Sequence, residues 1–94
     1  MNVLGRNLLT EFSEKHANVK SALEAWFHEA CKAEWKTPQD IKNRYRSADF
    51  LDDNRVIFDI KGNHYRLVVK VHYQNGIVRV EWVGTHAEYS KKRF

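Results

Sequence analysis

Residues 55–89 constrain the fold of this 94-residue chain more than any other stretch, because apolar and polar side chains alternate there between two turn signals. The segment reads RVIFDIKGNHYRLVVKVHYQNGIVRVEWVGTHAEY, and the pairs Gly62-Asn63 and Asn75-Gly76 divide it into three runs. Such pairs between alternating runs are strong signals for short hairpins. The stretch therefore predicts a three-stranded antiparallel meander that ends in a polar segment, residues 84–89.

The two turns also predict the register of the meander. A two-residue loop at Gly62-Asn63 places Asp59 opposite Arg66, and one at Asn75-Gly76 places Lys70 opposite Glu81. Because side chains alternate across a sheet, one face is then almost wholly apolar. It consists of Val56, Phe58, Ile60, Tyr65, Leu67, Val69, Val71, Tyr73, Val78, Val80 and Trp82. The other face is predicted to be wet and charged, around an apolar row formed by Ile57, Val68 and Val83.

The first half of the chain predicts helices that cover the apolar face. Apolar residues recur at helical spacing over residues 6–15 and, more regularly, after a cap at Asn18 over residues 19–33. Thr37-Pro38 begins a short third helix that ends near Arg44, and residues 45–54 are expected to form a loop. Residues 1–5 form either a brief edge strand or a lead-in to the first helix. The sequence thus predicts a single α+β domain, residues 1–94, with two N-terminal helices on one face of an antiparallel sheet.

Composition indicates which kinds of partner and which cellular setting the chain favours. The net charge is +4, with 16 basic and 12 acidic residues, which favours a polyanionic partner such as RNA or DNA. No stretch approaches the roughly 20 apolar residues of a membrane span, and the N-terminal residues do not resemble a secretory signal. One cysteine, Cys31, fits a reducing cytoplasm. No histidine or cysteine spacing is typical of a metal site, and we expect no cofactor.

The register places acid–base and cationic groups at one end of the sheet. Lys61 and His64 lie at the first hairpin tip with Arg66 beside them, and His86 and Tyr89 follow where the last strand ends. RNA cleavage at a 2′-hydroxyl needs a proton carrier near neutral pH and cations that stabilise the phosphate. Strict alternation would direct His86 to the apolar face, so we predict an irregular backbone at Gly84 or Thr85.

Each of these residues also has a simpler interpretation. Arg66 could form a cross-strand ion pair with Asp59, Lys70 could pair with Glu81, and Lys61 could be an ordinary turn residue. From these features alone, two further functions remain open. One is a non-catalytic basic module that binds RNA or DNA, and the other is an interaction protein with an exposed Trp35 or Phe94.

Three runs of the sequence resemble the HigB family of bacterial toxins, within the RelE-like superfamily. They are WKTPQDIK at residues 35–42, NRVIFDIKGNHYRLVVKVHY at residues 54–73 and VGTHAEY at residues 83–89. The resemblance implies a compact domain of helices on a twisted antiparallel sheet. It also implies a ribosome-dependent mRNA endonuclease that cuts translated mRNA in the decoding site without a metal ion. The implied partner is a HigA-like antitoxin with a helix-turn-helix domain, through which alone the toxin would reach operator DNA.

The resemblance also implies roles for single residues. Lys61 and Arg66 are similar to the family's phosphate-binding cations, His86 to its general acid or base, and Tyr89 to its C-terminal aromatic residue. We further expect RNA-binding residues in the hairpin tip, in the basic segment before the third helix, on the charged sheet face and after Tyr89. These are Asn63, His64, Lys36, Lys70 and Lys91.

Overall fold

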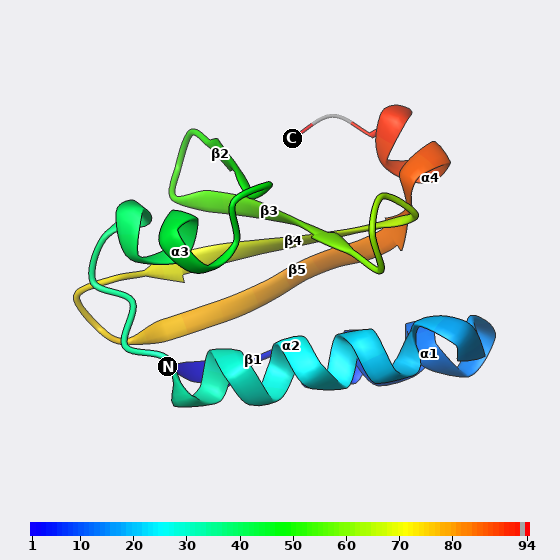
Figure 1. The fold of residues 1–94 in the computed structure, drawn as a ribbon, viewed down its shortest axis with the longest axis horizontal. Helices are drawn as coiled ribbons and strands as arrows, with labels where there is room; N and C mark the ends of the chain where they lie inside the picture. The colour runs from blue at the N-terminus through cyan, green and yellow to red at the C-terminus, as the bar shows by residue number, and fades with distance from the viewer. Residues whose placement is uncertain (93) are drawn as a thin grey trace.

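A computed structural model describes residues 1–92 and residue 94, and it confirms the α+β architecture (Figure 1). The strands form one mixed five-stranded sheet in the order β1-β5-β4-β3-β2. The elements in chain order are β1 (Asn2–Leu4), α1 (Arg6–Lys15), a 3₁₀ turn (Ala17–Val19), α2 (Lys20–Lys32), α3 (Pro38–Arg44), β2 (Asp49–Leu51), β3 (Arg55–Ile60), β4 (Tyr65–His72), β5 (Ile77–Thr85) and α4 (His86–Ser90).

The centre of the sheet is the predicted meander, and its first hairpin has the predicted register. Asp59 faces Arg66 and Ile60 faces Tyr65 across β3 and β4. The sheet also has two edge strands. β1 pairs in parallel with β5, which confirms the edge-strand alternative for the N-terminus. β2 pairs with β3, so the prediction that residues 45–54 form only a loop is wrong for Asp49–Leu51.

The second hairpin differs from the prediction in register. Four residues, 73–76, separate the strands, and His72 rather than Gln74 faces Ile77. The predicted Lys70–Glu81 opposition is therefore wrong, since Lys70 faces Arg79. Asn75-Gly76 occupies the second half of this loop and not its centre, with Gly76 at a positive φ of 68° and the Asn75 N–H donating to the carbonyl of His72.

A β-bulge lies further along β4 and β5. Beyond it, the side chains of β5 point to the faces opposite to those predicted. Val69 faces Val80 but Val68 faces Trp82, so Glu81 is an extra residue in β5. The predicted irregularity at Gly84 or Thr85 is therefore misplaced. Because one inserted residue moves every later side chain to the opposite face, Trp82 leaves the apolar face and Val83 joins it. Both assignments in the sequence-based register are corrected by this single bulge.

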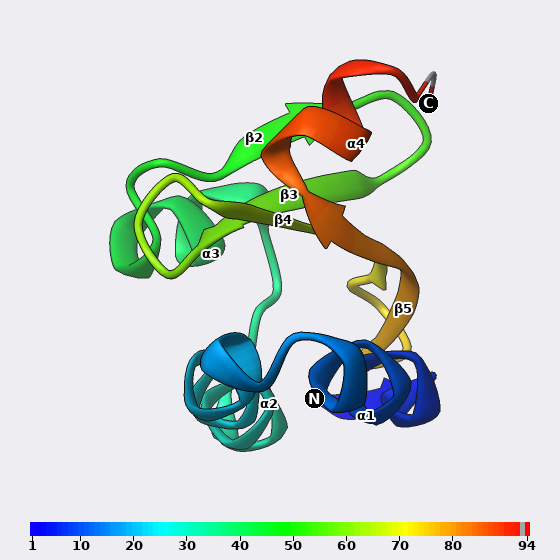
Figure 2. The same cartoon turned by 90° about the vertical axis from the view of Figure 1, so that its right-hand side faces the viewer.

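Helices α1, α2 and α3 cover the apolar face, and α1 and α2 lie side by side beneath the sheet (Figure 2). The buried core joins these helices to nine sheet residues. Its members are Leu9, Val19, Leu23, Trp26, Ala30, Trp35, Ile41, Ala48, Val56, Phe58, Ile60, Tyr65, Leu67, Val69, Val71, Val78 and Val80. Trp35 is 5% exposed and stacks on Phe58, which contradicts the alternative in which Trp35 binds a partner.

Local chemistry explains most helix boundaries. Gly5 begins α1 at a φ of 88°, and a Cβ there would lie 2.9 Å from the carbonyl oxygen of Val80, so glycine allows α1 to start against β5. The predicted start of α3 is confirmed, with Thr37 and Asp40 forming a reciprocal capping box. Asn18 does not cap α2. Val19 precedes the helix, and the Asn18 side chain accepts a hydrogen bond from Tyr65.

Helix α4 was not predicted, because residues 84–89 were expected only to form a polar segment where the last strand ends. Thr85 caps α4, since its hydroxyl accepts from the Glu88 N–H, and the Thr85 N–H in turn donates to Oε1 of Glu88 at 2.8 Å. Helix α4 lies on the side of the sheet opposite α1 and α2 (Figure 2). None of the helices formed by the described residues has the length and apolar content that a membrane crossing requires.

Candidate functional site

The strongest concentration of predicted site residues lies where the β3–β4 loop meets the start of α4. The backbone N–H of His86 donates to the carbonyl of His64 at 2.9 Å, which joins two segments that are 22 positions apart. Both imidazoles are exposed, as are Lys61 and Asn63 in the same loop. The predicted convergence at this end of the sheet is therefore seen, although a helix start, and not a bulge at Gly84, turns the chain at His86.

Arg66, near the start of β4 after this loop, holds the loop in shape through its side chain. Its side chain is only 10% exposed, and its Nε lies 3.1 Å from Oδ1 of Asp59. Nη1 donates to the carbonyls of Asn63 and Tyr65, and Nη2 donates to Oδ1 of Asn63 at 2.8 Å. Most of the guanidinium donors thus hold the loop in shape, and the ion-pair interpretation of Arg66 is correct.

Lys61 ties the same loop to the helical layer. It has a positive φ of 52°, a left-handed conformation that is uncommon outside glycine. Its Nζ donates to the carbonyl of Asn18 at 2.9 Å, and Oδ1 of Asn18 accepts from the Tyr65 hydroxyl at the same distance. Asn18 therefore anchors the hairpin from the segment between α1 and α2, while the Lys61 side chain remains exposed to a ligand.

His16 lies at this end of the molecule as well, and sequence reasoning missed it. Its ring stacks on Phe12 with centroids 4.2 Å apart and meets the edge of Tyr65 at 6.0 Å. The pKa of the Glu88 carboxyl is lowered, chiefly by the hydrogen bond from the Thr85 backbone, with a smaller contribution from the charge of His16. No local pattern marks His16, but the sequence Thr85-x-x-Glu88 is a capping-box signal that would have predicted α4.

Tyr89 lies on α4 within a group of aromatic rings. Its centroid is 6.1 Å from that of Trp82, and it stacks on Phe94 at 6.0 Å. Nζ of Lys92 lies 5.8 Å from the Trp82 centroid. Trp82 was placed in the core by the sequence-based register, so its presence beside Tyr89 is a consequence of the bulge at Glu81.

Three predicted RNA-binding residues lie away from the loop. Lys36 borders a depression with Met1 and the residues 73–76, at the opposite end of the sheet. Lys70 forms an ion pair with Asp53 at 2.9 Å, and Lys91 is exposed at the end of α4. Arg93, which follows Lys91 and Lys92 in the sequence, is outside the described residues.

The second sheet face is less wet and less charged than predicted. Ile57 is 2% and Val68 is 0% exposed, although neither lies on the core face. Acidic partners also neutralise cations along this face. Besides Arg66 with Asp59, Arg55 pairs with Glu81 at 2.7 Å, an interaction that raises the pKa of Arg55. These ion pairs reduce the net positive charge of the face, on which Arg79 of β5 remains exposed.

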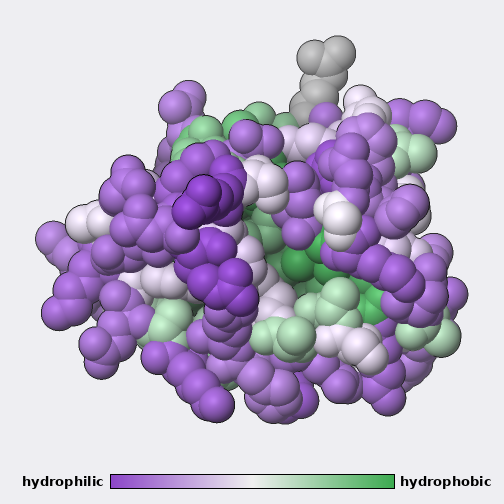
Figure 3. Space-filling model, in the orientation of Figure 1, coloured by the Kyte–Doolittle hydropathy of each residue, from purple (hydrophilic) through white to green (hydrophobic). Residues whose placement is uncertain are grey.

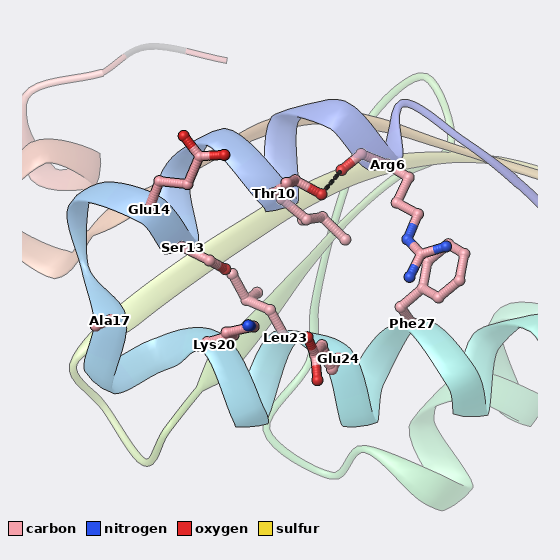
Figure 4. A pocket seen from close by; sticks show the side chains of 10 residues that line it. Arg6, Thr10, Ser13, Glu14, Ala17, Lys20, Leu23, Glu24 and Phe27 are labelled. Atoms are coloured by element: carbon pink, nitrogen blue, oxygen red, sulfur yellow. Dashed lines mark hydrogen bonds between the residues drawn. The ribbon is translucent and has the colours of Figure 1, made fainter.

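A separate groove of about 370 Å³ lies between α1 and α2 (Figure 4). Leu9 and Leu23 contribute to its apolar lining, and the guanidinium of Arg6 lies 4.3 Å above the ring of Phe27. Its charges are mixed, with Lys20 near one end and glutamates along both helices. Seen from the side of Figure 1, hydrophilic residues cover most of the surface, and hydrophobic ones gather in a hollow right of centre (Figure 3). The groove contains none of the predicted site residues.

Among the described residues, no group of three or more His, Cys, Asp and Glu side chains is arranged to hold a metal ion. The groups gathered at the loop are imidazoles, an amine and a guanidinium, which can carry protons and bind phosphate.

Helices on one face of a mixed five-stranded sheet, with imidazole and cationic groups at one end, define a small basic α+β domain of the RelE-like class. Residues 19–92 match the family described as HigB toxin, the RelE-like toxic component of a toxin–antitoxin system. The chain belongs to this family, as its resemblance in sequence predicted.

Curated relatives agree with the family assignment. The chain is 28% identical over 91 residues to the mRNA interferase toxin HigB of Escherichia coli (strain K12). The match covers 95% of this chain and 88% of that protein. The mRNA interferases HigB of Escherichia coli O157:H7 and Shigella flexneri match with the same identity and coverage. The comparison therefore extends over the loop, α4 and nearly all of the remaining chain.

Proposed function

We propose that this toxin is a ribosome-dependent mRNA endonuclease that cuts translated mRNA in the decoding site and so inhibits translation in the cytoplasm. Membership of a toxin family and the printed names of its relatives support this activity. The net charge of +4 favours a ribonucleoprotein surface as the place of action. The proposed partner is a HigA-like helix-turn-helix antitoxin, and operator DNA is contacted only through it.

The observation that carries the proposal is the hydrogen bond between the His86 N–H and the His64 carbonyl. It brings two exposed imidazoles and the Lys61 amine to one end of the sheet. In the proposed reaction, the 2′-oxygen of a ribose attacks the adjacent phosphorus as its proton passes to a base. The bond from phosphorus to the 5′-oxygen breaks, and an acid protonates that oxygen. The products are a 2′,3′-cyclic phosphate and a 5′-hydroxyl.

In this mechanism His86 is the proton carrier, because the nitrogens of an imidazole can both accept and donate a proton. Lys61 exchanges its contact with the Asn18 carbonyl for an oxygen of the scissile phosphate. Arg66 contributes positive charge beneath the loop and keeps Asn63 in place through two hydrogen bonds. Tyr89 contacts a base or assists proton transfer. Imidazole and cationic groups supply every role, so the proposed step uses no metal ion.

Binding is proposed to extend beyond the reacting phosphate. Asn63 and His64 contact the mRNA at the loop, and Lys91 contacts it from the end of α4. Lys36 and Lys70 are separated from the loop, and we propose that they contact ribosomal RNA instead. Because each phosphate contact releases counterions, association with ribosomes should weaken steeply as salt rises.

The proposal is tested by inducing wild type, His86→Ala and His28→Ala separately in cells and mapping mRNA 5′ ends. His28 is an exposed histidine on α2 and is the matched control, since its substitution removes the same groups far from the loop. We expect new 5′ ends and growth arrest with wild type and His28→Ala, and a strong reduction of both with His86→Ala. Circular dichroism of each variant checks the fold.

Identical transcript ends and growth for wild type and the His86→Ala/Arg66→Ala double variant would reject a nuclease. If ribosome co-sedimentation were nevertheless preserved and salt-dependent, the chain would be a non-catalytic RNA-binding module instead.

A further inference from the structure

An irregularity in β5 places the partly buried Trp82 on the second face of the sheet. Val78 and Val80 point into the core, so strict alternation would also bury Trp82 there. The extra residue Glu81 instead turns Trp82 to the second face, opposite Val68. Bulges that redirect a side chain in this way are common beside functional sites. The other two tryptophans are 2% and 5% exposed in the core, whereas Trp82 is only partly buried.

The Trp82 ring packs directly on the backbone of Gly84, close to the start of α4. A Cβ on Gly84 would lie 2.4 Å from both Cζ2 and Cη2 of Trp82, so the benzene half of the indole occupies the space above this glycine. Gly84 faces Arg66 in the register of β4 and β5. The ring therefore lies over the Gly84–Arg66 pair of the sheet. Gly84 directly precedes Thr85, the residue that caps α4.

The surroundings of Trp82 resemble surfaces that hold unpaired bases. Tyr89 and Phe94 have ring centroids 6.1 and 5.9 Å from that of Trp82. The Lys92 amine lies within 6 Å of the Trp82 and Phe94 rings, where it can pair with a phosphate of the same strand. Aromatic rings beside cations bind single-stranded nucleic acid, because bases stack on the rings while phosphates meet the cations.

We propose that Trp82 is a base-stacking residue that binds a nucleobase next to the scissile phosphate and so influences which nucleotide precedes or follows the cut. The ligand class is unpaired RNA. The inference rests on the proposed nuclease function and deepens it, since it adds a specificity contact to the same site. Trp82 takes no part in proton transfer, so its replacement changes binding and nucleotide preference before it changes the chemical step.

The first test measures stacking without cleavage. A short RNA oligomer with a 2′-deoxy nucleotide at the scissile position lacks the attacking oxygen and stays intact during titration. We expect it to quench the tryptophan emission of wild type but not that of Trp82→Phe, whose remaining tryptophans are buried. Trp82→Leu should bind about tenfold more weakly than wild type, and Trp82→Phe should fall between the two.

Phe50→Leu is the matched control, because Phe50 is an exposed aromatic residue, 38% exposed, on the distant edge strand β2. It should bind as wild type does. Absence of Trp82 quenching, or equal affinities for wild type and Trp82→Leu, would overturn the proposal. Thermal melts of the variants check folding, and Trp82→Phe keeps an aromatic ring if the leucine variant is unstable.

The second test maps cut sites in cells for wild type, Trp82→Phe and Trp82→Leu. We expect cutting to persist with a changed nucleotide distribution beside the cut. Unchanged positions would overturn the specificity role while leaving the nuclease proposal intact. Quenching by RNA without any cutting by wild type would reject the nuclease proposal and retain Trp82 as a stacking residue.

Discussion

Asp59→Ala is expected to be among the most destabilising substitutions on the second sheet face. Arg66 is 8% exposed, and the carboxylate of Asp59 is the only anion that the structure pairs with it among the described residues. Removing one partner of a buried ion pair costs about 3–5 kcal/mol, because the other charge stays buried without compensation. The Asp59 side chain is 21% exposed, and Arg66 keeps its hydrogen bonds to Asn63 and Tyr65. We therefore expect a loss of about 2–3 kcal/mol, below the full range.

For a domain of this size, a loss of that magnitude lowers the melting temperature by about 10–20 °C. Urea denaturation followed by circular dichroism measures the free energy of unfolding directly. Asp53→Ala is the matched control, since it removes the carboxylate of the Lys70 pair, whose Asp53 side chain is 62% exposed. That variant should lose less than Asp59→Ala, because its exposed ion pair is screened by solvent, and its loss includes the strain of alanine at the positive φ of 65° at position 53.

The explanation depends on an uncompensated charge, so replacing both partners provides a further check. Asp59→Ala/Arg66→Met should recover part of the loss, because the remaining side chain no longer carries a buried charge. Equal free energies of unfolding for Asp59→Ala and Asp53→Ala, within about 0.5 kcal/mol, would refute the reasoning. They would show that water reaches Arg66 well enough to replace the lost carboxylate.

Two other perturbations test separate parts of the fold. The Glu88 pKa lies below its usual 4.5, chiefly through the Thr85 N–H, so Glu88 stabilises α4 above that value and the contribution is lost as pH falls through the lowered pKa. NMR should therefore show α4 fraying under acid before the sheet melts, and simultaneous loss would contradict this order. Ile41 is fully buried and anchors the short helix α3. Ile41→Ala should cost about 2–5 kcal/mol and Ile41→Val about 0.5–1.5 kcal/mol in urea denaturation, and equal losses would argue against a packed site.

The two hairpins show why turn signals predict register only in part. At Gly62-Asn63 the sequence predicted every pair from Ile60 and Tyr65 outward. At Asn75-Gly76 the same reasoning failed, because this dipeptide occupies the second half of a four-residue loop, whereas Gly62-Asn63 lies at the centre of a loop of the same length. Side-chain alternation could not reveal the error. A two-residue slip keeps all faces unchanged, and the bulge at Glu81 exchanges Trp82 for Val83, both of which are acceptable in a core.

The candidate site was predicted better in location than in detail. Sheet register brings Lys61, His64 and His86 to one end, and the sequence contains that information. The partners of Arg66 depend on the loop conformation, which no pattern of residue types specifies. His16 reaches the site from the end of α1 through helix packing, so only the three-dimensional structure could place it there.

In the β3–β4 loop, the residues that maintain its conformation differ from the exposed residues that are proposed to contact RNA. Arg66 is committed to Asp59 and to oxygens of Asn63, and Asn18 anchors Tyr65 from the helical layer. These interactions hold the loop through buried or backbone groups, and they leave the imidazoles of His64 and His86 exposed. In the proposed mechanism this division favours binding, because reacting groups held from beneath lose little freedom when RNA binds. It follows that substitutions of Arg66 and Asp59 should impair activity mainly through stability, whereas substitution of His86 should impair it in a folded protein.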